Sequence, residues 1–407
     1  MHSFASLLAR LFCLLRSTCM LALGVFAAAA FADEPAEGSR PPLTLRPITP
    51  LMGYAMCPEA DAAQVLQQAH ALHVQGLAQS GYRVMRLSCD TVGGRDTSGM
   101  LQPNASRFPQ GIDALSHALR EQGLIPGLSL NASALIHPDA TADLDADLTH
   151  VLRHWNVDFL QINAPRPHAN TQACLTPLAH KMRHIKPHAA LVLNTGTFPG
   201  RWVIDVADAW RVAPTAPANA SDPFAACVLA PLDHAQDAWQ TTYPGRTPDL
   251  GPLRFAGLDA NQRRTHFTLW CMLASPLFIT DSLIGDDALD ANTRDLITTP
   301  ELIALHQDPL VQPARRLHVA GEVELWARPL GDGLHTGHLA VAVLNRSTAP
   351  ATFTLNPVTL GLDPTASVSV VDFISGKPTL PTISVSPHAV VLLRVRGLAV
   401  HKSPFAR

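Results

Sequence analysis

The sequence predicts an α/β fold, a (β/α)8 TIM barrel followed by a C-terminal antiparallel β-sandwich domain. In residues 48–312, short apolar runs alternate with segments of helical periodicity, which is the pattern of a parallel barrel. In residues 313–400 the helical periodicity is lost, and alternating segments separated by turn residues indicate an all-β domain. The chain therefore has the length and the pattern of one large domain and one smaller one.

The individual elements follow from the periodicity of the apolar residues. Barrel strands are expected at 49–54, 82–87, 123–130, 158–163, 190–194, 208–212 and 276–280, with the seventh of the eight placed only as lying before Leu258. Helices are expected at 61–79, 112–120, 144–155, 175–185, 224–239, 263–273 and 289–297, and residues 95–112 are expected to form a long loop up to the second of these helices. Strands of the second domain are expected at 322–328, 339–345, 352–356, 367–373 and 389–395.

The first 32 residues have the features of a cleaved secretory signal peptide. Arg10 and Arg16 precede an apolar run at 20–31, and the small-x-small sequence Ala30-Phe31-Ala32 follows. The run is too short for a comfortable membrane span. We therefore expect a secreted or periplasmic protein with no membrane association after cleavage. Residues 33–47, rich in proline and charge, are expected to be an exposed lead-in.

Composition limits the kinds of ligand. The net charge of −3 gives no reason to expect a nucleic acid partner. Five cysteines remain after the signal peptide, and none has the CxxC spacing of a zinc site. A disulfide between Cys57 and Cys89 and a set of unpaired thiols are equal alternatives. Four histidines also lack the spacing of metal ligands: His168, His180, His184 and His188. We therefore expect neither a metal nor a cofactor. The sequence does not specify an oligomeric state.

Asn163 occupies a position that decides the function. The buried run 159–162 ends at this residue, and Pro165 stops the strand. In a parallel barrel, the residue at the C-terminal end of a strand points into the active-site mouth. The question is therefore what an amide can do there.

Several motifs occur in the order in which one enzyme family carries them. They are Arg95-Asp96, Arg107-Phe108-Pro109, Arg264-Thr265-His266-Phe267-Thr268-Leu269-Trp270, His306-Gln307-Asp308-Pro309-Leu310, Glu324-Leu325-Trp326-Ala327-Arg328 and Val343-Leu344-Asn345-Arg346-Ser347. In this respect the chain resembles glycoside hydrolase family 27, the retaining α-galactosidases and α-N-acetylgalactosaminidases, over nearly all of residues 48–397. The resemblance implies a carbohydrate ligand, a barrel with a C-terminal β domain, and two catalytic carboxylates about 5–5.5 Å apart.

The resemblance places neither carboxylate where the family has one. The family's nucleophilic Asp at the end of strand four corresponds to Asn163. Its acid/base Asp, four residues after the arginine that ends strand six, corresponds to Thr215, since that arginine is Arg211. The resemblance also assigns substrate-binding positions, at Tyr54, Asp90, Asn131, Gln161, Arg211 and Asp249.

These replacements predict a pseudoenzyme, because an amide is a poor nucleophile and a hydroxyl is a poor general acid. The first alternative is an active glycosidase with relocated carboxylates, for which Asp90, Asp249 and Asp281 follow predicted strands. Asp249 and Asp281 are more readily interpreted as a loop acid and a helix N-cap. The second alternative is a carbohydrate-binding or interaction protein. No aromatic cluster in the sequence supports it, because the tryptophans are scattered and two are expected in the core, Trp210 and Trp326.

Overall fold

The computed structural model describes residues 49–56, 60–88, 91–135, 143–164, 171–217, 219–331, 337–400 and 404–405. The expected signal peptide, the lead-in and the positions of Cys57, Cys89 and Asp90 lie outside these ranges. Within them, no helix combines the length and the apolar character needed to cross a bilayer.

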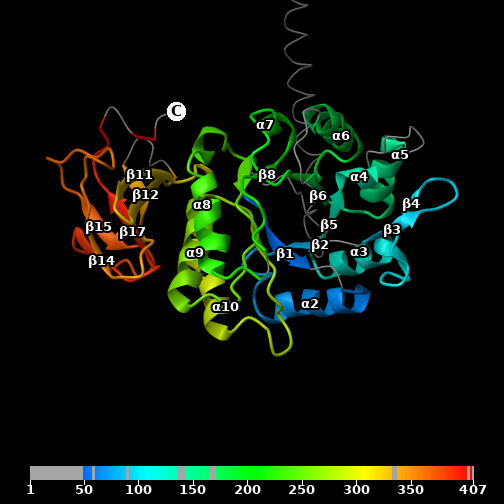
Figure 1. The fold of residues 1–407 in the computed structure, drawn as a ribbon, viewed down its shortest axis with the longest axis horizontal. Helices are drawn as coiled ribbons and strands as arrows, with labels where there is room; N and C mark the ends of the chain where they lie inside the picture. Colours follow the sequence, from blue (N-terminus) through cyan, green and yellow to red (C-terminus); the bar gives the residue numbers. More distant parts are fainter. Residues whose placement is uncertain are drawn as a thin grey trace, which may run out of the picture. The chain divides into compact units, whose positions relative to one another are not determined.

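Eight parallel strands form a TIM-like barrel sheet, in the order β10-β1-β2-β5-β6-β7-β8-β9 (Figure 1). The strands are β1 (Met52–Met56), β2 (Val84–Leu87), β5 (Ile125–Asn131), β6 (Phe159–Asn163), β7 (Ala190–Asn194), β8 (Ala209–Arg211), β9 (Thr247–Asp249) and β10 (Leu277–Ile279). The two end strands are joined just after β9, where Leu253 makes one parallel bridge to Ile279. This arrangement confirms the predicted barrel class and places the seventh strand at β9.

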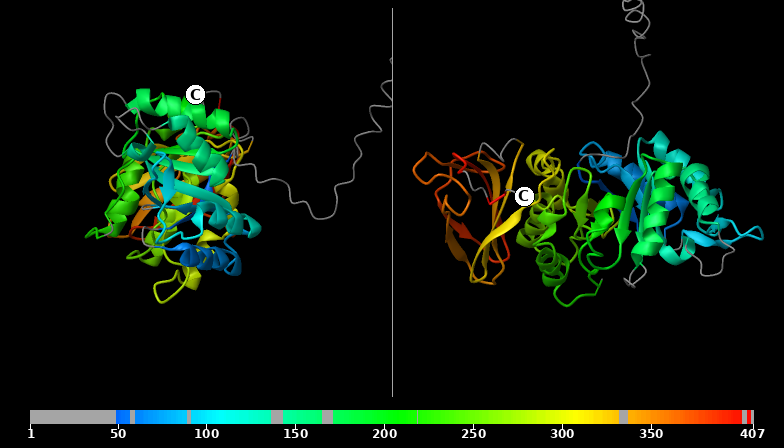
Figure 2. Two further views of the ribbon diagram at one scale, coloured as in Figure 1. Left: turned by 90° about the vertical axis from the view of Figure 1, so that its right-hand side faces the viewer. Right: turned by 90° about the horizontal axis from the view of Figure 1, so that it is seen from above.

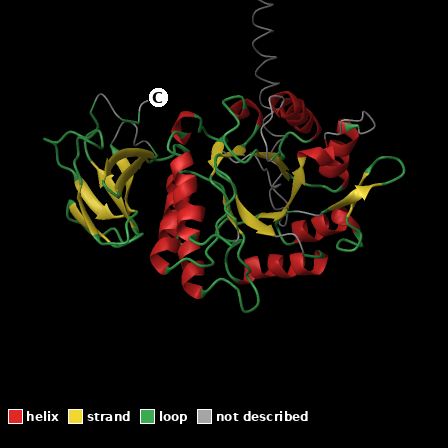
Figure 3. Ribbon diagram, viewed as in Figure 1, coloured by secondary structure: helices red, strands yellow, loops and turns green. Residues whose placement is uncertain are grey.

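The helices lie outside the barrel strands (Figure 3). They are α2 (Ala62–Val74), α3 (Gly111–Glu121), α4 (Ala132–Leu135), α5 (Leu144–Thr149), η1 (His150–His154), α6 (Thr171–Ile185), α7 (Val203–Val206), η2 (Ala225–Leu229), α8 (Ala230–His234), η3 (Ala238–Gln240), α9 (Ala260–Met272), α10 (Ala291–Ile297) and α11 (Pro300–His306). Two long helices begin at capping boxes, in which Asp61 and Asp259 accept the backbone N–H three residues on.

Local geometry explains most departures from the expected elements. The helix expected at 144–155 continues from α5 into the π-helical turn η1, and the one expected at 224–239 is likewise interrupted, so periodicity alone sees one element. The expected loop at 95–112 instead carries an antiparallel hairpin, β3 (Val92–Arg95) with β4 (Leu101–Pro103). The hairpin is anchored to α5, because Arg95 donates two hydrogen bonds to Asp147 of that helix.

The C-terminal domain consists of two antiparallel sheets (Figure 2). One has the order β11-β12-β13-β17-β15 and the other pairs β14 with β16. Their bounds are β11 (Arg315–Ala320), β12 (Val323–Pro329), β13 (His338–Asn345), β14 (Ala351–Thr354), β15 (Ser369–Asp372), β16 (Thr382–Val385) and β17 (Val390–Arg396). A separate apolar core includes Leu325, Val341, Ile383 and Leu393, which confirms the predicted antiparallel domain.

A buried carboxylate ties this domain to the barrel. Glu324 of β12 is 2% exposed, and its Oε1 accepts hydrogen bonds from Arg316 at 3.1 Å and from Arg346 at 2.9 Å. Arg346 also makes a two-point contact with Asp233 of α8, at 2.7 and 2.8 Å. The hydrogen bonds that Arg346 donates to Asp233 raise the pKa of Arg346. The indole N–H of Trp326 occupies the other oxygen of Glu324 at 2.8 Å.

We expect Glu324→Ala to lower the free energy of unfolding by about 1–3 kcal/mol, because the donors of Arg316, Arg346 and Trp326 lose their shared acceptor, while Asp233 still pairs with Arg346. Urea unfolding of the variant measures this. Asp145→Ala is the matched control, since it breaks an exposed ion pair with Lys181 that is worth at most about 1 kcal/mol. Equal losses in the two variants would contradict the role of burial.

Candidate active site

A row of polar side chains crosses the C-terminal ends of the barrel strands. The register aligns Asn131 of β5 with Asn163 of β6, and Asn163 with Asn194 of β7. On the next pair of strands, Arg211 of β8 aligns with Asp249 of β9. Neighbouring strands of a sheet lie about 4.8 Å apart, so the five side chains start from one layer of the barrel.

Asn163 lies inside a network of neutral hydrogen-bonding groups. Its Oδ1 accepts from the amide of Gln161 at 2.8 Å and from the amide of Asn194 at 3.1 Å. Its own amide donates to the hydroxyl of Ser129 at 2.9 Å. Both hydrogen-bonding ends of the side chain are therefore engaged, and the network fixes the amide in the barrel mouth.

The network continues to one cation. Gln161 is buried, and its oxygen accepts a hydrogen bond from Arg86 of β2. The guanidinium of Arg86 also lies over the ring of Phe278, 4.7 Å from its centroid. Gln161 thus links the charge of Arg86 to the amide of Asn163.

Thr215 lies next to a buried ion pair. Arg211 donates to Thr215 Oγ1 at 3.0 Å, and its other nitrogens contact Asp249 Oδ2 at 3.0 Å. The second oxygen of Asp249 accepts the backbone N–H of Gly251 at 2.9 Å. Arg211 and Asp249 are only 3% and 5% exposed, so each neutralises the other away from solvent.

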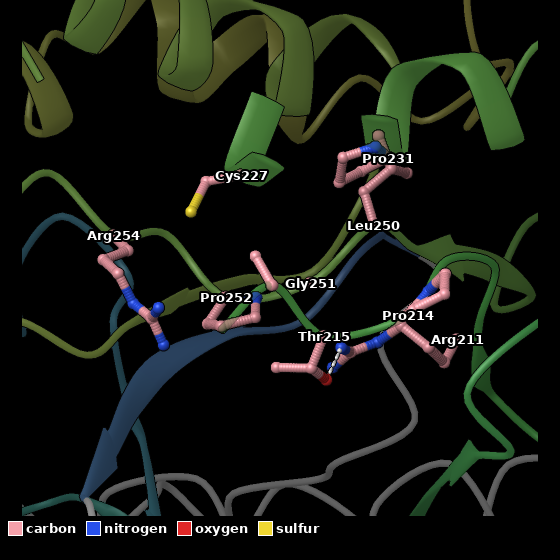
Figure 4. A pocket seen from close by; sticks show the side chains of 10 residues that line it. Arg211, Pro214, Thr215, Cys227, Pro231, Leu250, Gly251, Pro252 and Arg254 are labelled. Atoms are coloured by element: carbon pink, nitrogen blue, oxygen red, sulfur yellow. Dashed lines mark hydrogen bonds between the residues drawn. The ribbon is translucent and has the colours of Figure 1, made fainter. Parts of the chain in front are cut away.

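A small pocket opens beside Thr215 (Figure 4). Its volume is about 20 Å³, which is room for roughly one water-sized group. The side chains around it include Arg211, Thr215, Cys227, Leu250 and Arg254. Burial raises the pKa of the Cys227 thiol, and the charge of Arg254 acts in the opposite direction.

Asp281 has a structural role that differs from the expected one. The helix N-cap interpretation is wrong, because α10 is capped by Asp290, whose carboxylate accepts the N–H of Thr293. Asp281 instead accepts the backbone N–H groups of Phe255 and Ala256, at 2.9–3.2 Å. Burial raises the pKa of its carboxyl group, and those two N–H groups act against that shift.

The remaining sequence-derived positions are Tyr54, Asn131 and Asp90. Tyr54 is buried on β1, and Asn131 is exposed at the end of β5. Asp90 lies outside the described residues. Among the described residues, no cluster of His, Cys, Asp and Glu side chains has the arrangement of a metal site.

Four residues that neighbour these positions were not singled out by the sequence: Arg86, Ser129, Asn194 and Arg254. Asn194 ends an apolar strand in the same way as Asn163, so strand-end position could have identified it. Ser129, Arg86 and Arg254 become neighbours of the site only through strand register and a loop contact, which leave no mark on the sequence.

Two parts of the chain match known family models. Residues 59–184 match the model described as alpha galactosidase A. Residues 320–395 match the alpha galactosidase C-terminal beta sandwich domain. Among curated proteins, alpha-galactosidase 3 of Arabidopsis thaliana is 27% identical over 350 residues, covering 80% of this chain and 75% of its own length.

Solved structures of low sequence identity share the fold. Alpha-galactosidase I from Mortierella vinacea superposes with a TM-score of 0.76 at 22% identity, over 89% of this chain and 100% of that one. An α-galactosidase from Saccharomyces cerevisiae, solved with raffinose, gives a TM-score of 0.70 at 17% identity, over 86% and 98% of the two chains.

Proposed function

We propose that this chain, a member of glycoside hydrolase family 27, does not hydrolyse glycosides by the family's retaining mechanism. In this proposal Asn163 occupies the position of the nucleophile and Thr215 that of the acid/base. The observation that carries the proposal is the bonding of Asn163, which receives two amide N–H groups and donates to Ser129.

The chemistry of these groups supports the proposal. The retaining mechanism needs a carboxylate to attack the anomeric carbon and to offset the positive charge that develops there. The neutral amide of Asn163 does neither well. The Thr215 hydroxyl has no proton to give at useful pH, and general acid catalysis alone is worth roughly 10²–10⁴ in rate.

The other candidate carboxylates already accept hydrogen bonds from the protein, which counts against a catalytic role for them. Both oxygens of Asp249 are occupied, one by Arg211 and the other by Gly251. The carboxylate of Asp281 holds the loop backbone at Phe255 and Ala256. A nucleophile or a proton donor that switches roles during a reaction needs an oxygen free to reach the substrate.

A second function, carbohydrate binding without turnover, is favoured by the polar strand ends. Ser129, Asn163 and Asn194 offer hydroxyl and amide groups that suit hydroxyl-rich ligands. One relative of the same fold was solved with raffinose. We propose that this barrel mouth keeps a sugar site, with Tyr54, Asp90, Asn131, Gln161, Arg211 and Asp249 as its substrate-binding positions.

We also propose that the protein is exported. The support is the charged and apolar pattern of the first 32 residues, which ends in a small-x-small site. Export would bring the barrel into contact with extracellular or periplasmic sugars.

Incubation of the purified mature protein with an aryl α-galactoside tests the proposal. We expect release of the phenol at the uncatalysed rate. Asp249→Ala, Asp281→Ala and Asp90→Ala are assayed in parallel. Turnover that one of these variants abolishes, while its fold is retained, would establish a relocated carboxylate and contradict the proposal.

A further inference from the structure

The pocket beside Thr215 contains a cationic atom with no hydrogen-bond partner. Nη1 of Arg254 is buried and donates no hydrogen bond to any described residue. Arg254 lines the same pocket as Thr215 and Gly251, and Figure 4 shows its guanidinium directed toward that space. A buried donor of this kind has a high cost unless a ligand or water satisfies it.

The backbone around Arg254 is held from both sides. Leu253 donates its N–H to Phe278 at 2.8 Å and bridges β10. The next two residues, Phe255 and Ala256, donate theirs to Asp281. Arg254 is therefore presented from a fixed loop, which reduces the entropy lost when a ligand binds.

One donor atom in this pocket, Nη1 of Arg254, is left without a partner although charged groups lie near it. The charge of Arg211 is matched by Asp249 in a direct contact. Asp281 attracts Arg254 electrostatically, but its oxygens accept the backbone N–H groups of Phe255 and Ala256. Cys227 and Thr215 contribute an uncharged thiol and a hydroxyl. Arg254 thus provides a positive charge at the place where the family places its acid/base carboxylate.

The hydrogen bonds at the strand ends independently indicate that the barrel mouth suits a ligand rich in acceptors. The two lone pairs of Asn163 Oδ1 are taken by Gln161 and Asn194. Ser129 Oγ receives two N–H groups, from Asn163 and Gln161. The second N–H of Asn163, the second N–H of Asn194 and the hydroxyl hydrogen of Ser129 remain for a ligand. The mouth therefore offers donors and few acceptors.

We propose that this mouth binds an acidic monosaccharide, with the sugar's carboxylate at Arg254 in the pocket beside Thr215. The inference rests on the proposed sugar-binding function and specifies its ligand class. The pocket's volume of about 20 Å³ suits one carboxylate oxygen and not a whole sugar ring. The ring itself would lie against the donors of Asn163, Asn194 and Ser129.

Titration calorimetry with galacturonate, galactose and acetate at neutral pH tests the proposal. We expect galacturonate to bind roughly 10- to 100-fold more tightly than galactose, the range that a charge-assisted hydrogen bond provides. Acetate should compete only weakly, because it lacks the ring. Arg254→Met should remove the preference for galacturonate, whereas Arg254→Lys should keep part of it.

Arg396→Met is the matched control, because it removes an exposed arginine from β17 of the other domain. Equal binding of galactose and galacturonate would overturn the ligand class and leave sugar binding intact. Binding of acetate as tight as that of galacturonate would reduce the site to a small-anion pocket and also overturn the proposal. Hydrolytic inactivity is tested separately, so its failure would be distinguishable from both results.

Discussion

Asn163→Asp is expected to give the protein turnover of 2,4-dinitrophenyl α-galactoside, a substrate whose leaving group needs no proton. The new carboxylate has the shape of the amide that it replaces. The Gln161 and Asn194 amides, 2.8 and 3.1 Å from the present oxygen, would donate to it. The hydroxyl of Ser129, at 2.9 Å, can rotate and donate as well. Three donors favour the ionised, nucleophilic form.

Adding Thr215→Asp should extend turnover to leaving groups that need protonation. We expect the double variant to exceed Asn163→Asp by roughly 10²–10⁴-fold on a methylumbelliferyl or alkyl galactoside, and much less on the dinitrophenyl substrate. The new carboxyl would lie near Arg211, which already contacts Thr215 at 3.0 Å. Because a neighbouring cation lowers a carboxyl pKa, the double variant should be most active at acidic pH.

Asn131→Asp is the control, since it adds the same charge to the same strand-end row without the three donors. A folded double variant with no turnover on either substrate would contradict the assignment of Asn163 and Thr215 to the two catalytic positions. Comparable gains from Asn131→Asp would show that charge alone matters.

Acid is expected to destabilise the protein strongly between pH 6.5 and about 3, through two buried histidines. Burial lowers the pKa of His306 from 6.5 to about 3 and that of His266 likewise to about 3. His306 is fully buried and its Nε2 lies 2.8 Å from the carbonyl oxygen of Ser275. Its Nδ1 accepts from Gln307 at 2.8 Å, which fixes the neutral form.

The direction follows from proton binding in the two states. Below pH 6.5 the unfolded chain takes up a proton on each histidine, whereas the folded chain does not until about pH 3. The stabilisation is therefore complete above pH 6.5 and is lost as the pH falls. Each histidine contributes about 1.4 kcal/mol per pH unit, or about 5 kcal/mol over the window.

Urea unfolding at several pH values between 7 and 4 measures this dependence. His306→Gln should reduce the slope of unfolding free energy against pH by about one proton, whatever its effect on stability at pH 7. His180→Gln, in a helix that faces solvent at this position, should leave the slope unchanged. An unchanged slope in His306→Gln would contradict a neutral buried imidazole.

The sequence was sufficient for the architecture because the apolar periodicities are long and regular. Trp210 and Trp326, expected in the core, are both fully buried. Short elements were missed, such as α11, whose seven residues follow α10 after a two-residue gap, and the strands β11 and β16. Such elements gain their stability from neighbours that local periodicity does not record.

The site was accessible from the sequence only where it lies on a strand end. Asn163 is placed by its position at the end of an apolar run, and Arg211 by the family resemblance. Strand register brings Arg86 to Gln161 and Arg211 to Asp249. The role of Asp281 depends on its contact with the loop at Phe255. These contacts connect residues 26 to 75 positions apart, so no local pattern predicts them.

Trapping of a covalent intermediate tests the central claim most directly. The mature protein is incubated with 2-deoxy-2-fluoro-α-galactosyl fluoride, which a retaining glycosidase converts to a long-lived glycosyl ester on its nucleophile. If the two-carboxylate site is absent, the intact mass of the unsubstituted protein stays unchanged. The Asn163→Asp variant should gain an adduct at position 163. A gain of one fluorogalactosyl group on the unsubstituted protein, mapped to an Asp or Glu, would contradict it.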